Sequence, residues 1–180
     1  MEGLLRHKPD FQINDQFGNS LLHYAALYGN DKIIDQILKC DYELNMTNDN
    51  LLEPFHAAIL SDSINTFLKL VQYRKKIGNF ENIFLQKTKF GFNCLHLAVK
   101  NNARKIFQYL MDQMDDYDQA DNEFRSALML SIAEGNLDFT HTLINRGADL
   151  SHLDIKGNNL LSYTAMYGEY QLFNVYNIRL

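Results

Sequence analysis

Three histidines, His23, His56 and His96, are the residues whose chemistry would first suggest a metal site. They lie 33 and 40 residues apart, and no Cys-x-x-Cys or His-x-x-x-His spacing accompanies them. Zinc sites usually draw ligand pairs from such short spacings. The spacing therefore favours a structural role for these histidines, and we expect neither a metal nor another cofactor.

The other reactive residue types show no catalytic pattern either. Cys40 and Cys94 have no obvious partner that would stabilise a thiolate. The acidic stretch 112–118 lacks the glycine and the distal glutamate of a calcium loop. We find no glycine-rich phosphate loop and no Gly-x-Ser-x-Gly turn. The sequence therefore predicts a protein that is not an enzyme.

The composition narrows the class of protein. The 180 residues are 46% hydrophobic and 22% charged, and 17 basic against 22 acidic side chains give a net charge of −5. An acidic balance without a long basic block argues against nucleic-acid binding, and no apolar run approaches the roughly 18 residues of a membrane span. Two cysteines are too few for a disulfide scaffold, which favours reduced thiols in a cytoplasmic setting.

A period of 33 residues runs along the chain. Similar segments recur around the anchor positions His23, His56, His96, Met129 and Ser162. Three of the four gaps between these anchors are 33 residues, and the remaining one is 40. A fixed period of this length is typical of a solenoid, in which each repeat is one supersecondary unit.

Each repeat is expected to hold two helices. The first begins after residues that mostly suit an N-cap, and the second carries an apolar stripe at helical spacing, such as Ile33, Ile34 and Ile37. Glycines keep the same phase at the turns. The N-cap positions are Ser20, Glu53, Asn93, Ser126 and Asn159, and the phased glycines are Gly18, Gly91 and Gly157, then Gly29, Gly135 and Gly168.

The segments 15–23 and 126–150 resemble the ankyrin-repeat family, whose consensus runs Asp-x-x-Gly-x-Thr-Pro-Leu-His-x-Ala-Ala and, after an apolar helix, Gly-Ala-Asp-Val. The resemblance implies an all-α fold, an α-solenoid of five stacked ankyrin repeats with hairpin fingers and a seven-residue insertion. One domain would hold repeats at 15–47, 48–87, 88–120, 121–153 and 154–180, with 1–14 as the remnant of a preceding repeat or an N-terminal cap. The family histidine would hydrogen-bond the backbone of a neighbouring hairpin.

Departures from the family consensus mark the middle of the chain. Only Pro54 keeps the family proline, while Leu51, Asp62 and Asn102 stand where other repeats have glycine. We therefore expect repeats two and three to be the least regular part of the stack.

The seven extra residues lie within 71–88. They equal about two helical turns, so a helix could lengthen there without rotating its buried face, with Ile77 continuing the apolar stripe and Gly78 ending it. One interpretation is a longer helix and finger that pack on the stack. The other is a protruding binding element with basic and aromatic side chains.

The two ends also fit the period. Residues 4–11 match 143–150, which places the start inside a second helix, and the final helix, 169–178, carries several apolar residues. A terminal repeat normally shows a polar outer face. We expect either a fragment of a longer protein, which we favour, or a surface that a partner covers.

Recognition is the function that the resemblance implies. In this family, finger tips and the exposed side of the first helices contact partners, and aromatic, Met and Arg side chains are enriched at such interfaces. The corresponding positions here are Phe17, Asn19, Tyr28, Lys89, Phe90, Phe92, Lys100, Arg125, Met166 and Tyr167. We expect Phe17, Tyr28, Phe90 and Phe92 to be partly exposed on the concave, finger-lined side, with Lys89, Lys100 and Arg125 as a cationic rim.

The leading hypothesis is a monomeric, non-catalytic scaffold that binds a partner protein through its concave face and fingers. Two finer versions are an effector that an intracellular pathogen delivers into a host cell cytosol and an inhibitor array that sequesters a transcription factor. The alternative is the substrate-recruiting ankyrin domain of a longer, multidomain enzyme.

Overall fold

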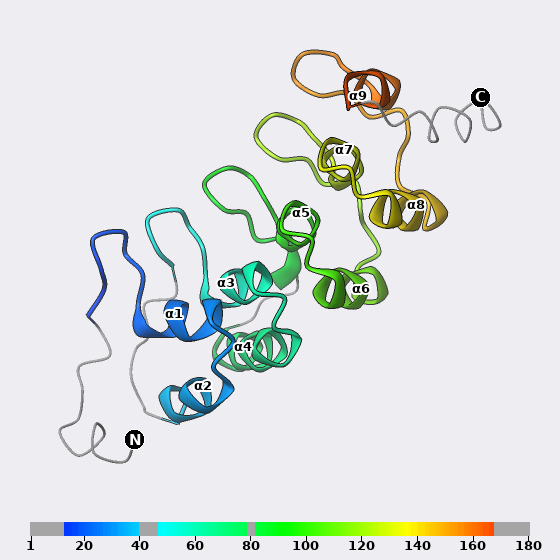
Figure 1. Ribbon diagram of the computed structural model, residues 1–180. Helices are drawn as coiled ribbons and strands as arrows, with labels where there is room; N and C mark the ends of the chain where they lie inside the picture. The colour runs from blue at the N-terminus through cyan, green and yellow to red at the C-terminus, as the bar shows by residue number, and fades with distance from the viewer. Residues whose placement is uncertain (1–12, 40–46, 79–81, 168–180) are drawn as a thin grey trace. The chain divides into compact units, whose positions relative to one another are not determined.

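A computed structural model describes residues 13–39, 47–78 and 82–167 of the chain, and within them nine α-helices are connected by turns and hairpin loops (Figure 1). Contacts divide the chain into two compact units, 1–81 and 82–180. Unit 1 contains α1 (Leu21–Leu27), α2 (Asp31–Ile37), α3 (Pro54–Leu60) and α4 (Ile64–Ile77). Unit 2 contains the short 3-10 helix η2 (Ile83–Leu85), then α5 (Cys94–Lys100), α6 (Arg104–Gln113), α7 (Ala127–Ala133), α8 (Leu137–Asn145) and α9 (Leu160–Tyr167).

In unit 1 the two helix pairs pack pair against pair. Helix α1 lies beside α3 and α2 beside α4, with the hairpin loops on the side of α1 and α3 (Figure 1). Small residues allow this close approach, because Ala26 and Ala58 are buried where the first helices meet. The second helices contribute larger side chains such as Ile34 and Phe67, which are fully buried. Neither helix pair could bury this surface alone, so stacking creates the core.

Unit 2 repeats the same arrangement. Helices α5, α7 and α9 form one row, and α6 and α8 form the other. The rings of Phe107 on α6 and Phe139 on α8 stack with their centroids 3.9 Å apart. N-caps also follow the expected register, because the side chains of Asn93, Ser126 and Asn159 each accept a backbone hydrogen bond in the first turn of α5, α7 and α9. The all-α solenoid class is confirmed.

The turns keep one backbone conformation whether or not glycine is present. Gly18 and Gly91 have positive φ angles of 77° and 80°, as expected. Leu51, Asp62 and Asn102, which replace glycine, also have positive φ angles, of 56°, 48° and 52°. The turns of repeats two and three are therefore built like the others, although a non-glycine residue is strained in this region.

The described part of the insertion packs on the stack. It lengthens α4 to 14 residues, and Gly78 ends the helix as expected. Arg74 reaches back to the N-cap of α3, where its Nε lies 2.5 Å from Oε2 of the buried Glu53. In unit 2, Phe84 is buried and meets Tyr109 edge to face. The expectation for Ile77 was wrong: it is half exposed, because the buried face of α4 ends at Val71.

Several expectations concern residues outside the described ranges. They are the preceding helix remnant at 4–11, Cys40, Gly168 and the final helix at 169–178. The second helix of a fifth repeat therefore lies outside as well, and the described residues contain four helix pairs followed by α9. None of the described helices is long and apolar enough to span a bilayer.

Candidate protein-binding surface

Each hairpin finger is organised by one polar side chain at its base. In the first finger, Asp15 Oδ1 accepts hydrogen bonds from the backbone N–H groups of Phe17 and Asn19, both at 2.8 Å. Equivalent residues follow with the period of the chain, and each accepts at least one backbone N–H of its own finger. They are Asn48, Thr88, Asp121 and Asp154. Because these groups bond to the backbone of their own fingers, the carboxylates of Asp15, Asp121 and Asp154 are directed into the fingers.

Neighbouring fingers are joined through their backbones. In unit 1 the Asp49 N–H donates to Phe17 O at 3.1 Å. In unit 2 the Asn122 N–H donates to Phe90 O at 3.2 Å, and the Ile155 N–H donates to Glu123 O at 2.9 Å. These bonds fix the spacing of the finger tips within each unit and leave the tip side chains at the surface.

The histidines hold the fingers to the helices. His23 Nδ1 accepts from the Ser20 N–H at 3.1 Å, and His96 Nδ1 accepts from the Asn93 N–H at 3.4 Å. Since a backbone N–H can only donate, Nε2 carries the ring proton in each case. Nε2 of His23 therefore donates to Leu52 O at 2.9 Å, and that of His96 to Arg125 O at 3.1 Å. The structural role is confirmed for both residues.

Burial keeps these histidines neutral. It lowers the pKa of His23, and it lowers the pKa of His96 to about 4. For His23 the geometry also needs a neutral ring, because a protonated Nδ1 could not accept the Ser20 N–H. In the part of the chain that the structure describes, no three His, Cys, Asp or Glu side chains gather as metal ligands would.

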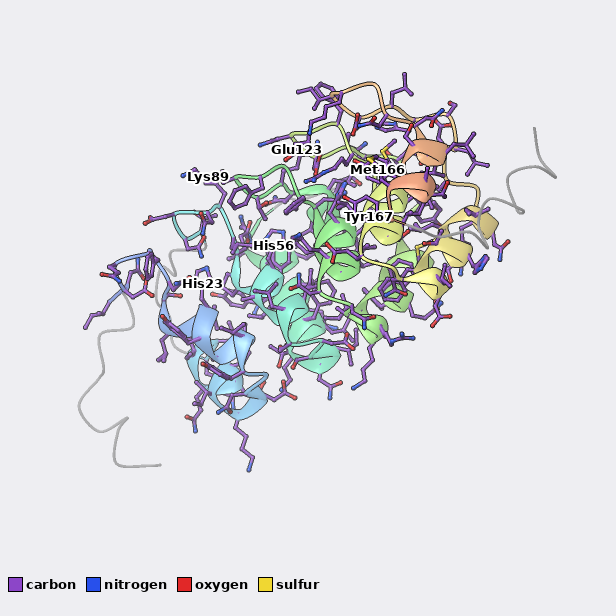
Figure 2. The ribbon with its side chains drawn as sticks, turned by 45° about the horizontal axis from the view of Figure 1, so that its top comes forward. His23, His56, Lys89, Glu123, Met166 and Tyr167 are labelled. Carbon is purple, nitrogen blue, oxygen red and sulfur yellow. The ribbon has the colours of Figure 1, made fainter. Side chains whose placement is uncertain are left out.

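Most of the expected contact residues are exposed within their own unit. In unit 1, Phe17 and Tyr28 are exposed, while Asn19 is half-buried, donates to Asp15 and accepts from Asn48. In unit 2, Phe90 is 59% exposed. Figure 2 shows Lys89 on a finger and Met166 and Tyr167 on α9, and all three are exposed.

The expectation for Phe92 was wrong, because only 9% of this residue is exposed. Its ring stacks on that of His96 at 6.1 Å between centroids. The cations of Lys100 and Arg125 lie 6.0 Å from the centre of the ring. Phe92 thus belongs to the base of the third finger, and these two cations cover it instead of forming a rim around an exposed cluster.

Ion pairs within unit 2 further limit how far Lys100 and Arg125 could bind a partner. Arg125 forms ion pairs with Asp121 at 2.7 Å and with Glu123 at 3.3 Å. Lys100 lies 3.4 Å from Glu134. Their charges are therefore shared with carboxylates of the same unit, and Lys89 is the member of the expected rim that extends from a finger tip.

Sequence reasoning missed three exposed apolar residues at the fingers. Leu51 and Phe124 are half exposed at positions where other fingers have glycine, and Ile155 is 60% exposed at the tip of the last described finger. The repeat alignment could have identified Leu51 and Phe124, because a large apolar side chain at a glycine position does not stabilise the turn and so suggests another role. We used Leu51 only to judge regularity and did not consider Phe124.

Comparison with known proteins agrees with this architecture. The family model for ankyrin repeats, in three copies, matches residues 1–81 and 77–154. An ankyrin repeat protein of Acanthamoeba polyphaga mimivirus is 24% identical over 163 residues, covering 90% of this chain and 20% of that protein. The nuclear factor NF-kappa-B p105 subunit of Gallus gallus is 28% identical over 153 residues, covering 83% of this chain and 15% of the subunit.

A third relative is the transient receptor potential cation channel subfamily A member 1 of Drosophila melanogaster, 28% identical over 162 residues, with 86% of this chain and 13% of the channel covered. The chain thus spans a fifth or less of the length of these relatives. It belongs to the ankyrin-repeat family. Ankyrin repeats generally mediate protein–protein interaction, and the family is generally non-catalytic.

Proposed function

We propose that this chain is a non-catalytic module that holds a partner protein through its finger tips and the exposed side of its first helices. The observation that carries the proposal is that each unit exposes aromatic residues at these positions, Phe17 and Tyr28 in unit 1 and Phe90 and Tyr167 in unit 2. Burying such side chains against a partner releases hydration water and supplies the type of anchor that dominates interface energetics.

Polar and charged residues at the fingers of each unit would orient a bound partner. Lys89 in unit 2 offers a charge, whereas the Asn19 amide in unit 1 is already bonded to Asp15 and Asn48. Lys100 and Arg125 contribute less than their charges suggest, because each is paired within unit 2. These residues therefore suit a protein segment with apolar side chains and some acidic groups.

The test compares exposed and buried aromatic residues of the fingers. Phe17→Ala and Phe90→Ala should each weaken binding by about 2 kcal/mol and change folding stability by less than about 0.5 kcal/mol. Phe92→Ala is the matched control, because this buried ring should cost stability. Partners are captured from eukaryotic cytosol on the immobilised chain and identified by mass spectrometry, and melting temperatures are recorded beside them. Loss of several degrees in both exposed variants would show that these residues are core and would refute the proposal.

The finer proposal concerns the setting of this interaction. We propose a monomer that acts in the cytoplasm of a host cell as an effector, and the similarity to a viral ankyrin repeat protein supports this version. The similarity to the nuclear factor NF-kappa-B p105 subunit supports a second candidate, an array that sequesters a transcription factor. A longer reading frame with a catalytic domain would instead favour a substrate-recruiting module. The identity of the captured partner separates the first two versions.

A further inference from the structure

Phe124 occupies a strained position that glycine holds elsewhere. Its φ angle is 57°, and its N–H donates to Asp121 O at 3.1 Å, which is the same turn that Gly91 forms with Thr88 at 2.9 Å. A side chain in left-handed backbone is less favourable than glycine. The turn itself therefore gains nothing from phenylalanine.

Burial does not compensate for this strain. Phe124 is 57% exposed, so more than half of the residue remains in water. His152 Nε2 lies 2.9 Å from the Phe124 carbonyl oxygen, which helps to hold the backbone of the strained residue. Strained backbone at a surface persists where the local structure holds it, and it is concentrated at sites of function.

A second substitution accompanies Phe124 on the adjacent finger. In the preceding finger pair, Asn122 of one finger packs against Gly91 of the other. A Cβ at residue 91 would lie 2.5 Å from the backbone nitrogen of Asn122. In the next finger pair the residue equivalent to Asn122 is Ile155, which is 60% exposed. The bond from the Ile155 N–H to Glu123 O joins the two tips at 2.9 Å. The positions that Gly91 and Asn122 hold in one finger pair are therefore held by Phe124 and Ile155 in the next.

The charges around this pair are asymmetric. Asp154 accepts hydrogen bonds from the N–H groups of Lys156 and Asn158, so its carboxylate faces into the finger. Glu123 shares Arg125 with Asp121, and the two carboxylates lie 3.3 Å and 2.7 Å from the guanidinium group. The side chain of Lys156, next to Ile155, is exposed at the tip. A cationic group therefore borders the apolar pair in a chain whose net charge is −5.

We propose that Phe124, Ile155 and Lys156, here called the finger 4–5 tip, form a docking site for an acidic peptide segment of a partner protein. An apolar side chain of the segment lies against Phe124 and Ile155, and a neighbouring carboxylate pairs with Lys156. The strain at Phe124 is retained because the ring serves recognition, not folding. This inference rests on the proposed function and assigns the partner chemistry to one place on unit 2.

The probe is a phage-displayed library of random peptides selected on the immobilised, intact chain. Enriched peptides should combine Asp or Glu with Leu, Ile or Phe. One of them is then synthesised with a fluorescent label, and its affinity is measured by anisotropy for each variant. Enrichment of basic peptides, or no enrichment, overturns the assigned chemistry.

Two glycine variants separate recognition from folding. Phe124→Gly should raise the melting temperature by about 2 °C or more and weaken peptide binding about thirtyfold. Leu51→Gly is the matched control, since it relieves the same backbone strain in unit 1 (φ 56°) and should leave peptide binding unchanged. Lys156→Glu should weaken binding with no loss of stability.

Three results would overturn the inference. One is a fall in melting temperature in Phe124→Gly, which would make the ring a packing residue. Another is unchanged peptide affinity in both Phe124→Gly and Lys156→Glu. The third is an equal loss of affinity in Leu51→Gly. If Phe90→Ala abolishes partner capture while the finger 4–5 variants bind normally, the proposed function stands and this docking site is wrong.

Discussion

Replacing Arg74 by methionine is expected to lower the free energy of unfolding by about 3 kcal/mol. Arg74 forms an ion pair with Glu53, whose side chain is 2% exposed, while Arg74 itself is 16% exposed. Nε lies 2.5 Å from Oε2, and Nη2 lies 3.4 Å from Oε1. Removing one partner of a buried pair costs about 3–5 kcal/mol, because the other charge stays in a poorly solvated site. Because Arg74 is partly exposed, water can solvate the site to some extent, and we expect the loss of unfolding free energy to lie at the lower end of this range.

A second substitution should restore most of this stability. The residue at the Glu53 position is the N-cap of α3, and serine occupies the same place before α1 and α7, as Ser20 and Ser126. The double variant Glu53→Ser, Arg74→Met therefore removes the buried charge and keeps a good N-cap. Replacing a buried pair by uncharged side chains is often close to neutral.

The assay is urea unfolding followed by far-ultraviolet circular dichroism on the wild type, both single variants and the double variant. The cycle of four free energies isolates the coupling between the two residues. We expect a coupling of about 2 kcal/mol or more. A single Arg74→Met variant that loses less than about 1 kcal/mol, or a double variant no more stable than the single ones, would refute the role given to this pair.

Two further predictions concern the finger bases and turns. Because His96 has a pKa of about 4 in the folded state against 6.5 in the unfolded chain, its neutral form stabilises the fold fully above pH 6.5, and up to about 3 kcal/mol is lost as the pH falls toward 4. His96→Met, which places at this anchor the residue found at Met129, should flatten that part of the pH profile of unfolding free energy, and an unchanged slope would contradict the burial argument. Gly91→Ala should destabilise more than Gly157→Ala in the same urea assay, since both have positive φ but only the Cβ at residue 91 would meet Asn122, at 2.5 Å from its nitrogen. Equal losses would show that the fingers are not closely packed there.

Most of the fold could be predicted from the 33-residue repeat period. It placed the helices and their N-caps, because these features depend on local register and recur wherever the register recurs. The bonding role of His23 and His96 came from the resemblance to the ankyrin-repeat family. Leu51 and Asn102 show the same effect, since neighbouring bonds hold the turn even where glycine is missing. The insertion was harder to interpret, because the contact between Arg74 and Glu53 joins residues 21 positions apart.

The binding surface was predictable only in part. Register assigned Phe90 and Phe92 to the same finger, but it does not say that the Phe92 ring turns onto His96 while Phe90 stays in water. Side-chain packing of this kind depends on the full set of neighbours, which here includes Arg125 of the next repeat. Phe124 was overlooked for a different reason: its exposure follows from an unfavourable backbone position, and a consensus comparison treats that as irregularity.

The bonds that join neighbouring fingers have an evolutionary consequence. They run from the N–H groups of Asp49, Asn122 and Ile155 to backbone oxygens, so they do not depend on which side chains stand at the tips. Mutation can therefore exchange tip residues that do not crowd these bonds, as a side chain at Gly91 would, while the spacing of the fingers is inherited unchanged. A few substitutions of this kind could change what the fingers contact without changing the scaffold, which relatives of only 24–28% identity still share.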